Sequence, residues 1–301
     1  MLPYGRAICY SGYRKNQSPI TKIYPTDDEV LEDLRLLEPH FDYLRMYDPY
    51  HHVQSVCRVI EKHQLKLKVM VGIEPRGEIS NPNCPWGGLH SEQEIAHNKV
   101  FNYTQLDLLA ELANRYPTIV NAVAVGNEST SEWHPNLMHP QTLADYVRYL
   151  KKKVKQPVTF CEGGHYWREK DEVIQKEVDF VSIHCYPLWQ RVPVMEAVQF
   201  TIKDYLDTRK RFPDKPIIFT EFGWATSADD KMIPGAANEK NQKIYLDEMI
   251  RFSKQNQIIM YIFEAFDEPW KGGNNPAEAE KNWGIFFENR TPKEYMKSLL
   301  K

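Results

Sequence analysis

Short apolar runs alternate with longer amphipathic stretches along the whole chain. Each run is rich in β-branched or aromatic residues, which is typical of a buried strand, and each following stretch has the apolar spacing of a helix. The pattern predicts eight strands, at residues 4–10, 41–47, 66–73, 120–126, 157–162, 178–186, 216–221 and 258–266.

The stretches between these runs carry the signals of helix N-termini. Thr26 precedes three acidic residues, where an N-cap hydroxyl and the helix dipole favour the same start point. Ser91 and Glu94 have the spacing of a capping box. The same periodicity predicts further helices within residues 139–154, 195–212 and 238–255.

Eight strand–helix units within 301 residues predict an α/β fold, a (β/α)8 TIM barrel that forms a single domain over residues 1–301. An open, doubly wound sheet is the alternative. It is less favoured because no glycine-rich phosphate-binding loop follows the first strand.

Charge and composition exclude several classes of function. The formal net charge of −3 argues against nucleic acid as a main partner, and no apolar run reaches the length of a membrane span. The first residues do not resemble a signal peptide, so we expect either a cytoplasmic protein or a chain whose leader has been removed. Five cysteines without CxxC spacing predict free thiols.

Acidic and aromatic residues gather at the carboxyl ends of the predicted strands, where the active sites of TIM barrels lie. The candidate site residues are Tyr47 and Asp48 after the second strand, Asn127 and Glu128 after the fourth, Glu162 after the fifth, Tyr186 after the sixth, Glu221 and Trp224 after the seventh, and Glu264, Asp267, Glu268, Trp270 and Lys271 after the eighth.

Glu128 and Glu221 form a candidate catalytic pair. The fourth and seventh strands of a small barrel face each other across its mouth, so these two carboxyl groups can lie on either side of a glycosidic bond. In a retaining glycosidase one carboxyl group protonates the leaving oxygen and the other attacks the anomeric carbon. Aromatic side chains at the same mouth suit the apolar C–H face of a sugar ring.

Five motifs resemble those of glycoside hydrolase family 17, the β-1,3-glucanases and related enzymes of the retaining (β/α)8 clan. They are "LRMYDP" (44–49), "VAVGNES" (123–129), "IIFTEFGW" (217–224), "FEAFDEPWK" (263–271) and "WGIFFENRTPK" (283–293), the last two in the style of bacterial members. The motifs occur in the family's order and span most of the chain.

The resemblance implies a role for each matching residue. Glu128 is the expected acid/base, Glu221 the expected nucleophile, and Asn127 the partner of the sugar 2-hydroxyl. Glu268 and Lys271 are expected to support the nucleophile. The expected substrate is β-1,3-glucan or a β-gluco-oligosaccharide, with no metal or cofactor, and the expected state is a monomer. Independently of the family, we expect the Tyr186 hydroxyl to hydrogen-bond Glu221, and Trp224 to form a wall of the sugar site.

Three other classes of function are less favoured. A metal site would draw on Asp48, His51, His52 and His184, but adjacent histidines rarely bind one ion. A sugar-binding barrel without catalysis would have lost one of the two acids. A phosphate-handling barrel would rely on "KGGNN" (271–275), which follows acidic residues that repel phosphate.

Hydrolysis and transfer to a second sugar remain open, because water or a sugar hydroxyl can attack the same intermediate. Trp133, Trp189 and Trp270 are candidate platforms for an acceptor sugar. The Pro- and Gly-rich stretch 74–90 predicts a long loop after the third strand. Such a loop can close one end of a cleft, which favours action at chain ends or transfer over cleavage within the chain.

Overall fold

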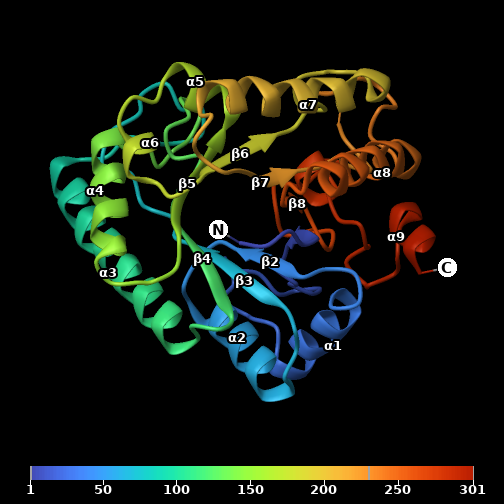
Figure 1. Cartoon of the computed structure of the whole chain (residues 1–301), viewed down its shortest axis with the longest axis horizontal. Coiled ribbons are helices and arrows are strands. Elements are labelled where there is room, and N and C mark those ends of the chain that lie inside the picture. The colour runs from blue at the N-terminus through green and yellow to red at the C-terminus, as the bar shows by residue number, and fades with distance from the viewer. Residues whose placement is uncertain (1, 230, 301) are drawn as a thin grey trace.

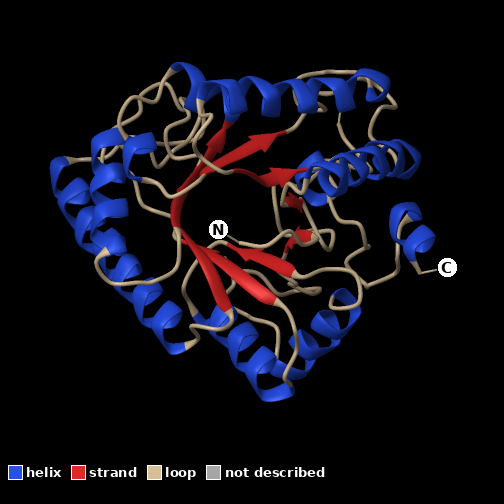
Figure 2. Ribbon diagram, viewed as in Figure 1, coloured by secondary structure: helices blue, strands red, loops and turns tan. Residues whose placement is uncertain are grey.

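The computed structural model describes residues 2–229 and 231–300. Eight parallel strands close into a barrel in chain order, so the first strand pairs with both the second and the eighth. Figures 1 and 2 show the strands as an inner ring with helices outside it. The strands are β1 (Ala7–Cys9), β2 (Tyr43–Met46), β3 (Lys68–Gly72), β4 (Val120–Asn127), β5 (Val158–Gly163), β6 (Val181–Cys185), β7 (Ile217–Phe222) and β8 (Met260–Ile262).

The helices of the described residues cover the outside of the barrel. They are α1 (Asp27–Leu37), α2 (His51–His63), α3 (Glu92–Arg115), α4 (Pro140–Lys151), α5 (Gly164–Glu169), α6 (Ile174–Glu177), α7 (Val194–Arg211), α8 (Glu239–Asn256) and α9 (Glu294–Leu299), with a 3-10 helix at Ala279–Lys281. The TIM barrel predicted from the sequence is therefore confirmed. None of the described helices combines the length and hydropathy that a membrane crossing needs.

Two predicted helix starts are confirmed in detail. At α1 the Thr26 hydroxyl accepts from the Glu29 amide at 3.3 Å, while the Glu29 carboxylate accepts from the Thr26 amide at 2.8 Å. Ser91 and Glu94 make the same reciprocal pair at α3. Each pair satisfies two backbone amides that have no partner inside the helix.

The predicted strand limits are too wide at the last strand. The apolar run 258–266 is buried, but β8 itself covers only Met260–Ile262. Beyond Ile262 the backbone bonds first to one neighbouring strand and then to the other. The Phe263 amide donates to Phe222 O of β7, and the Ala265 amide donates to Cys9 O of β1. Helices α5 and α6 were not predicted, because four to six residues are too few to show a helical period.

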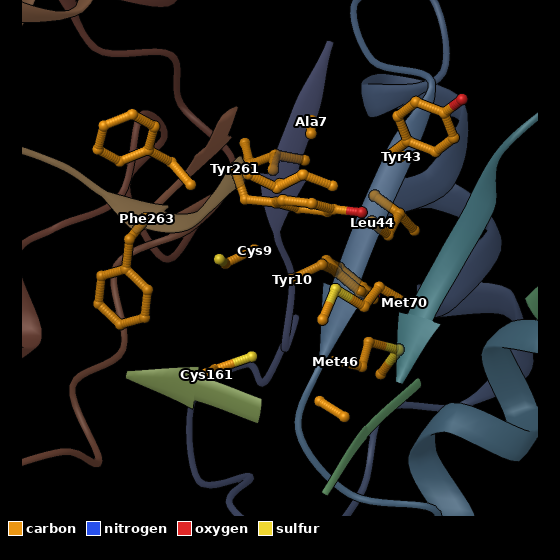
Figure 3. Close-up of a cluster of buried hydrophobic side chains, with 14 of the residues drawn as sticks. Ala7, Cys9, Tyr10, Tyr43, Leu44, Met46, Met70, Cys161, Tyr261 and Phe263 are labelled. Carbon is orange, nitrogen blue, oxygen red and sulfur yellow. The ribbon is translucent and has the colours of Figure 1, made fainter. Parts of the chain in front are cut away.

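The barrel interior is closed by side chains rather than left open as a pore. Figure 3 shows part of the buried apolar core of the molecule, with Ala7 and Cys9 from β1, Leu44 and Met46 from β2, and Tyr261 from β8. All five cysteines are buried and unpaired, which confirms the prediction of free thiols. This packed floor leaves the loops at the carboxyl ends of the strands to build a site above it.

Candidate active site

One large cavity, of about 1170 Å³, opens at the carboxyl end of the barrel. Loops from every side of the mouth line it, from Ser11 after β1 round to Trp270 after β8. Of the residues predicted to form the site, the cavity is lined by Tyr47, Asp48, Asn127, Glu128, Glu162, Tyr186, Glu221, Glu268, Trp270 and Lys271.

Glu221 lies on the floor of this cavity and is 5% exposed. It is the last residue but one of β7, which ends at Phe222. Its Oε1 accepts from the Tyr47 hydroxyl at 3.0 Å and is paired with the Arg45 guanidinium. Its Oε2 accepts from the Tyr186 hydroxyl at 2.6 Å, the hydrogen bond expected from the sequence. Both oxygens are therefore held in one orientation.

His184 stands between the two predicted catalytic acids. Its Nδ1 is 2.7 Å from Oε1 of Glu128 and 3.6 Å from Oε2 of Glu221. One donor atom from each of these three residues lies within 4.8 Å of the others. The fold thus brings Glu128 and Glu221 together from strands far apart in the sequence.

The charges around Glu221 keep it ionised. Burial alone would raise its pKa, but the His184 imidazolium and the Arg45 guanidinium, together with the hydrogen bond from Tyr186, lower the pKa to about 2. Burial likewise disfavours the charged form of His184, yet the Glu221 and Glu128 carboxylates raise its pKa to about 10. A carboxylate and an imidazolium therefore lie side by side at neutral pH.

Arg45 links the nucleophile candidate to the acid/base strand. It lies on β2 and is 3% exposed. One end of its guanidinium meets Glu221, and its Nη2 donates to Oδ1 of Asn127 at 2.6 Å. The planar guanidinium has donors enough for both partners. The orientation of the Asn127 amide next to Glu128 is thus set by Arg45.

The predicted supporting residues after β8 contact one another rather than Glu221. Lys271 Nζ is 2.9 Å from a Glu264 oxygen and 2.5 Å from a Glu268 oxygen. Glu268 also accepts hydrogen bonds from the Ser11 hydroxyl and from Trp270 Nε1. Burial and the Glu268 charge raise the pKa of Glu264, which lies behind the cavity surface. The support that Glu268 and Lys271 were expected to give the nucleophile does not take the form of a contact between the described side chains: the partners of Glu221 come from β2, β6 and the residue after each.

Besides Glu264, two more of the predicted site residues, Trp224 and Asp267, do not line the cavity. Trp224 is fully buried, its ring packs 5.6 Å from that of Tyr245, and its Nε1 donates to Ala236 O at 3.0 Å. It packs beneath α8 and forms no wall of the sugar site, so that expectation is wrong. Asp267 turns away as well, to pair with the buried Lys293 at 2.7 Å.

Glu162 anchors the loop that follows Glu128. It is 3% exposed and accepts from the Thr130 hydroxyl at 2.6 Å and from the Ser131 hydroxyl at 3.1 Å. Burial and the neighbouring Glu128 charge raise its pKa. Glu128 itself has a φ of 52°, an unusual value outside glycine. The hydrogen bonds of Thr130 and Ser131, two and three residues further along the chain, help to hold that backbone.

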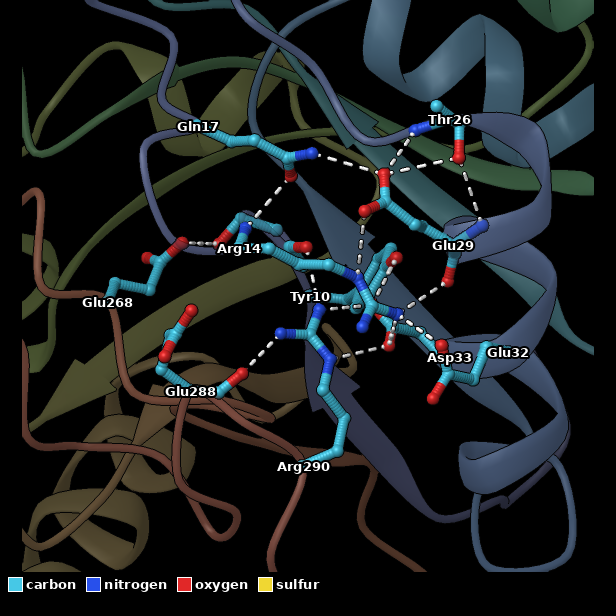
Figure 4. A network of polar contacts seen from close by, with 12 residues as sticks. Tyr10, Arg14, Gln17, Thr26, Glu29, Glu32, Asp33, Glu268, Glu288 and Arg290 are labelled. Atoms are coloured by element: carbon cyan, nitrogen blue, oxygen red, sulfur yellow. Dashed lines mark hydrogen bonds and ion pairs between the residues drawn. The ribbon is translucent and has the colours of Figure 1, made fainter.

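A polar network anchors the loop after β1, which forms another side of the cavity. Buried Asp33 on α1 is paired with Arg14 at 3.1 Å and with Arg290 at 2.7 Å, and it accepts from the Tyr10 hydroxyl at 3.1 Å. Figure 4 shows these groups together, with Glu268 at the edge of the network. The loop that carries Ser11 is therefore tied both to α1 and to the C-terminal segment.

Of the residues named for a metal site from the sequence, only His184 belongs to the group of possible ligands found among the described residues. Within residues 2–229 and 231–300, Glu128, His184 and Glu221 are the group with donor atoms close enough for one cation. His52 instead contacts Ser11 O, and the His51 ring packs against that of Tyr24. The Arg45 guanidinium on Glu221 opposes a cation at the remaining group.

Arg45 and His184 are the main contacts of Glu221 that were not predicted, although both stand at strand ends and His184 was a candidate metal ligand. Each is a charged or polar residue inside an otherwise apolar strand run, in "YLRMY" and "VSIHCY". A buried charge needs a partner. Two such residues, in strands that end at the same mouth as Glu221, could have been predicted to contact its carboxylate.

Comparisons with known proteins identify the family of this chain. Residues 7–284 match the family described as the BtgE/BtgC glycoside hydrolase domain. The chain is 23% identical to the probable glucan endo-1,3-beta-glucosidase btgC of Aspergillus fumigatus over 93% of this chain, and spans only 41% of that relative's length.

Solved structures share the fold. An endo-laminarinase from Formosa superposes with a TM-score of 0.83 at 22% identity, covering 98% of this chain and 86% of that one. An active-site mutant of Rhizomucor miehei beta-1,3-glucanosyltransferase in complex with laminaritriose gives a TM-score of 0.75 at 22% identity, covering 96% of each chain.

Proposed function

Since the chain belongs to the BtgE/BtgC glycoside hydrolase domain family, we propose that it cleaves β-1,3-linked glucan or gluco-oligosaccharides by a retaining, two-step mechanism. Glu221 is the nucleophile and Glu128 the acid/base. The observation that carries this proposal is the approach of their carboxyl oxygens to within 4.8 Å. Retaining enzymes need a carboxyl separation of about 5–5.5 Å, whereas inverting enzymes need roughly 6.5–9.5 Å to admit a water molecule.

In the first step Glu128 protonates the oxygen of the leaving sugar while an oxygen of Glu221 attacks the anomeric carbon. The bond from that carbon to the leaving oxygen breaks, and an ester to Glu221 forms. The low pKa of Glu221 keeps it charged for this attack. Tyr47 and Tyr186 hold its two oxygens.

In the second step Glu128, now a carboxylate, takes a proton from the attacking hydroxyl. The new bond forms at the anomeric carbon, and Glu221 leaves as a carboxylate. The contact of His184 Nδ1 with Oε1 of Glu128, at 2.7 Å, orients the Glu128 carboxyl group for this proton transfer. Two inversions at one carbon give net retention.

Sugar recognition is assigned to polar and aromatic groups on the cavity wall. Asn127 bonds the 2-hydroxyl, and its orientation is held by Arg45. Asp48, Glu268 and Lys271 offer further hydrogen-bonding groups, and Trp270 offers a flat ring. One chain supplies all of these groups, which supports a monomer as the proposed acting unit.

The experiment is product analysis on purified β-1,3-gluco-oligosaccharides, with proton NMR during the first minutes. We expect the β-anomer to appear first and the α-anomer only as the product mutarotates. The α-anomer appearing first overturns the mechanism. Glu221→Ala should abolish turnover with the fold retained, whereas Glu196→Ala, which removes an exposed carboxylate of α7, should behave as the wild type.

A transferase is the second candidate, because the attacking hydroxyl of the second step can belong to a sugar. The observation that favours it is the exposure of tryptophans on the cavity rim, of which Trp133 is 47% and Trp189 37% exposed. Products longer than the starting oligosaccharide would demonstrate transfer. Shorter products alone would mean hydrolysis.

A further inference from the structure

The loops after β3 and β4 are joined into one wall, here called the β3–β4 wall and defined as residues 74–90 and 129–139. Asn81 in the first loop is 3% exposed and donates from Nδ2 to Glu132 O at 2.7 Å and to His134 O at 3.0 Å. Other loop-to-loop bonds are Gly77 N to Asn136 Oδ1, Cys84 Sγ to Trp133 O, His90 Nε2 with Pro135 O, and the amides of Glu78 and Ile79 to Leu137 O.

This wall is fixed relative to the acid/base. Its second loop starts directly after Glu128, and Glu162 holds the first part of that loop through the hydroxyls of Thr130 and Ser131. The end of this second loop is bonded to its start, because the Met138 amide donates to Ser129 O at 2.7 Å. The wall cannot shift far without moving Glu128.

The position next to Glu128 indicates which sugar the wall would meet. The acid/base acts on the oxygen that joins the cleaved sugar to the leaving sugar, and later on the hydroxyl that replaces it. A surface continuous with Glu128 therefore lies on the side of the leaving or incoming sugar. Trp270, by contrast, belongs to the loops after β1 and β8, since its ring packs 5.7 Å from Tyr13.

The wall presents two large aromatic rings to the cavity. Trp86 is 65% exposed and Trp133 is 47% exposed, and both line the cavity. Rings exposed to this extent contribute little to packing, although the loops that carry them are tightly bonded. Exposed aromatic surface on a rigid support is typical of a ligand site, and a flat ring suits the C–H face of a pyranose.

We propose that the β3–β4 wall is the binding site for an incoming gluco-oligosaccharide acceptor, with Trp86 and Trp133 as its stacking platforms. The proposal rests on the retaining mechanism given above. An acceptor hydroxyl seated there attacks the anomeric carbon, gives its proton to the Glu128 carboxylate, and displaces Glu221 as a carboxylate. The wall thus sets what fraction of the glycosyl groups bound to Glu221 is transferred to a sugar instead of to water.

The test uses 4-nitrophenyl β-laminaribioside as donor and laminaritriose as acceptor with the full chain. Release of nitrophenol reports formation of the ester, and chromatography reports how much of it becomes longer oligosaccharide. The acceptor concentration that gives half-maximal transfer should rise about tenfold in Trp86→Ala and in Trp133→Ala, the equivalent of about 1.4 kcal/mol per ring. The double variant should transfer less than either.

Phe200→Ala is the matched control, since Phe200 is a 40% exposed aromatic residue of α7 that does not line the cavity. Its acceptor dependence should equal that of the wild type. An unchanged acceptor dependence in the double variant overturns the proposal, as does a wild type that releases nitrophenol but forms no longer product at any acceptor concentration. A wild type that releases no nitrophenol contradicts the proposed glycosidase function itself. Melting temperatures equal to that of the wild type exclude misfolding as the cause.

Discussion

Replacement of His184 by asparagine removes the positive charge that stands between the two carboxyl groups. The imidazole Nδ1 lies 3.6 Å from Oε2 of Glu221. At an effective dielectric constant of about 20, one full charge at that distance is worth about 5 kcal/mol. Water and neighbouring side chains that rearrange around the vacated site recover about half of this, so the pKa of Glu221 should rise by roughly two units.

The direction follows from the sign of the lost charge. An imidazolium favours the ionised nucleophile, so its loss raises the pKa of Glu221 from about 2 towards about 4. The acidic limb of kcat/KM against pH reports ionisation of groups in the free enzyme. His184→Asn should therefore lose half its kcat/KM near pH 4, where the wild type still has its nucleophile charged.

The assay is initial-rate hydrolysis of a laminari-oligosaccharide between pH 3 and 7, with melting temperatures recorded at each pH. Tyr186→Phe is the matched control, because it removes a 2.6 Å hydrogen bond to the same oxygen without changing the charge. Its acidic limb should move by less than that of His184→Asn. An acidic limb that stays in place in His184→Asn, in folded protein, refutes the assigned electrostatics.

Three further predictions concern the acid/base, pH-dependent stability and Trp224. Glu128→Ala should lose activity on natural glucan but still release the leaving group of a nitrophenyl donor, which needs no protonation; loss of both activities would show that Glu128 is not the acid. The pKa of His184 is raised from 6.5 to about 10 in the folded protein. Its stabilisation is therefore complete below about pH 6.5 and lost as the pH rises through 10, by roughly 3–5 kcal/mol. Urea unfolding at pH 6.5 and pH 10 should show that loss in the wild type and little of it in His184→Asn; equal losses would count against the charged pair. Trp224→Ala should lower the free energy of unfolding by about 3–5 kcal/mol and leave KM for oligosaccharides near the wild-type value, whereas a large rise in KM with normal stability would return Trp224 to the sugar site.

The barrel was predictable because its signals are local. Each strand run and each cap, such as Thr26 with Glu29, is encoded within a few residues. The pairing of Glu128 with Glu221 also followed, because the ends of parallel strands must meet at one mouth once the barrel is accepted. Short helices and the limits of β8 did not follow, since a run stays apolar wherever it is buried, whether or not it pairs as a strand.

The partners of the nucleophile were harder to predict than the nucleophile. Glu221 is held by Arg45 and Tyr47 from β2 and by His184 and Tyr186 from β6, and only the tyrosines were expected in the site. Side-chain direction decides such contacts, and it depends on register and barrel curvature rather than on sequence spacing. Trp224 shows the same limit, because its position three residues after Glu221 did not reveal that the chain turns its ring under α8.

The central claim, that Glu221 forms a covalent bond to the sugar, can be tested by trapping that bond. A 2-deoxy-2-fluoro β-laminaribiosyl donor with a good leaving group should glycosylate the enzyme faster than the resulting glycosyl ester is hydrolysed. After proteolysis, mass spectrometry should find one added fluorodisaccharide on the peptide that contains Glu221, and none in Glu221→Ala. A label on another carboxylate, or an enzyme that turns over the donor without any label, would contradict the assignment.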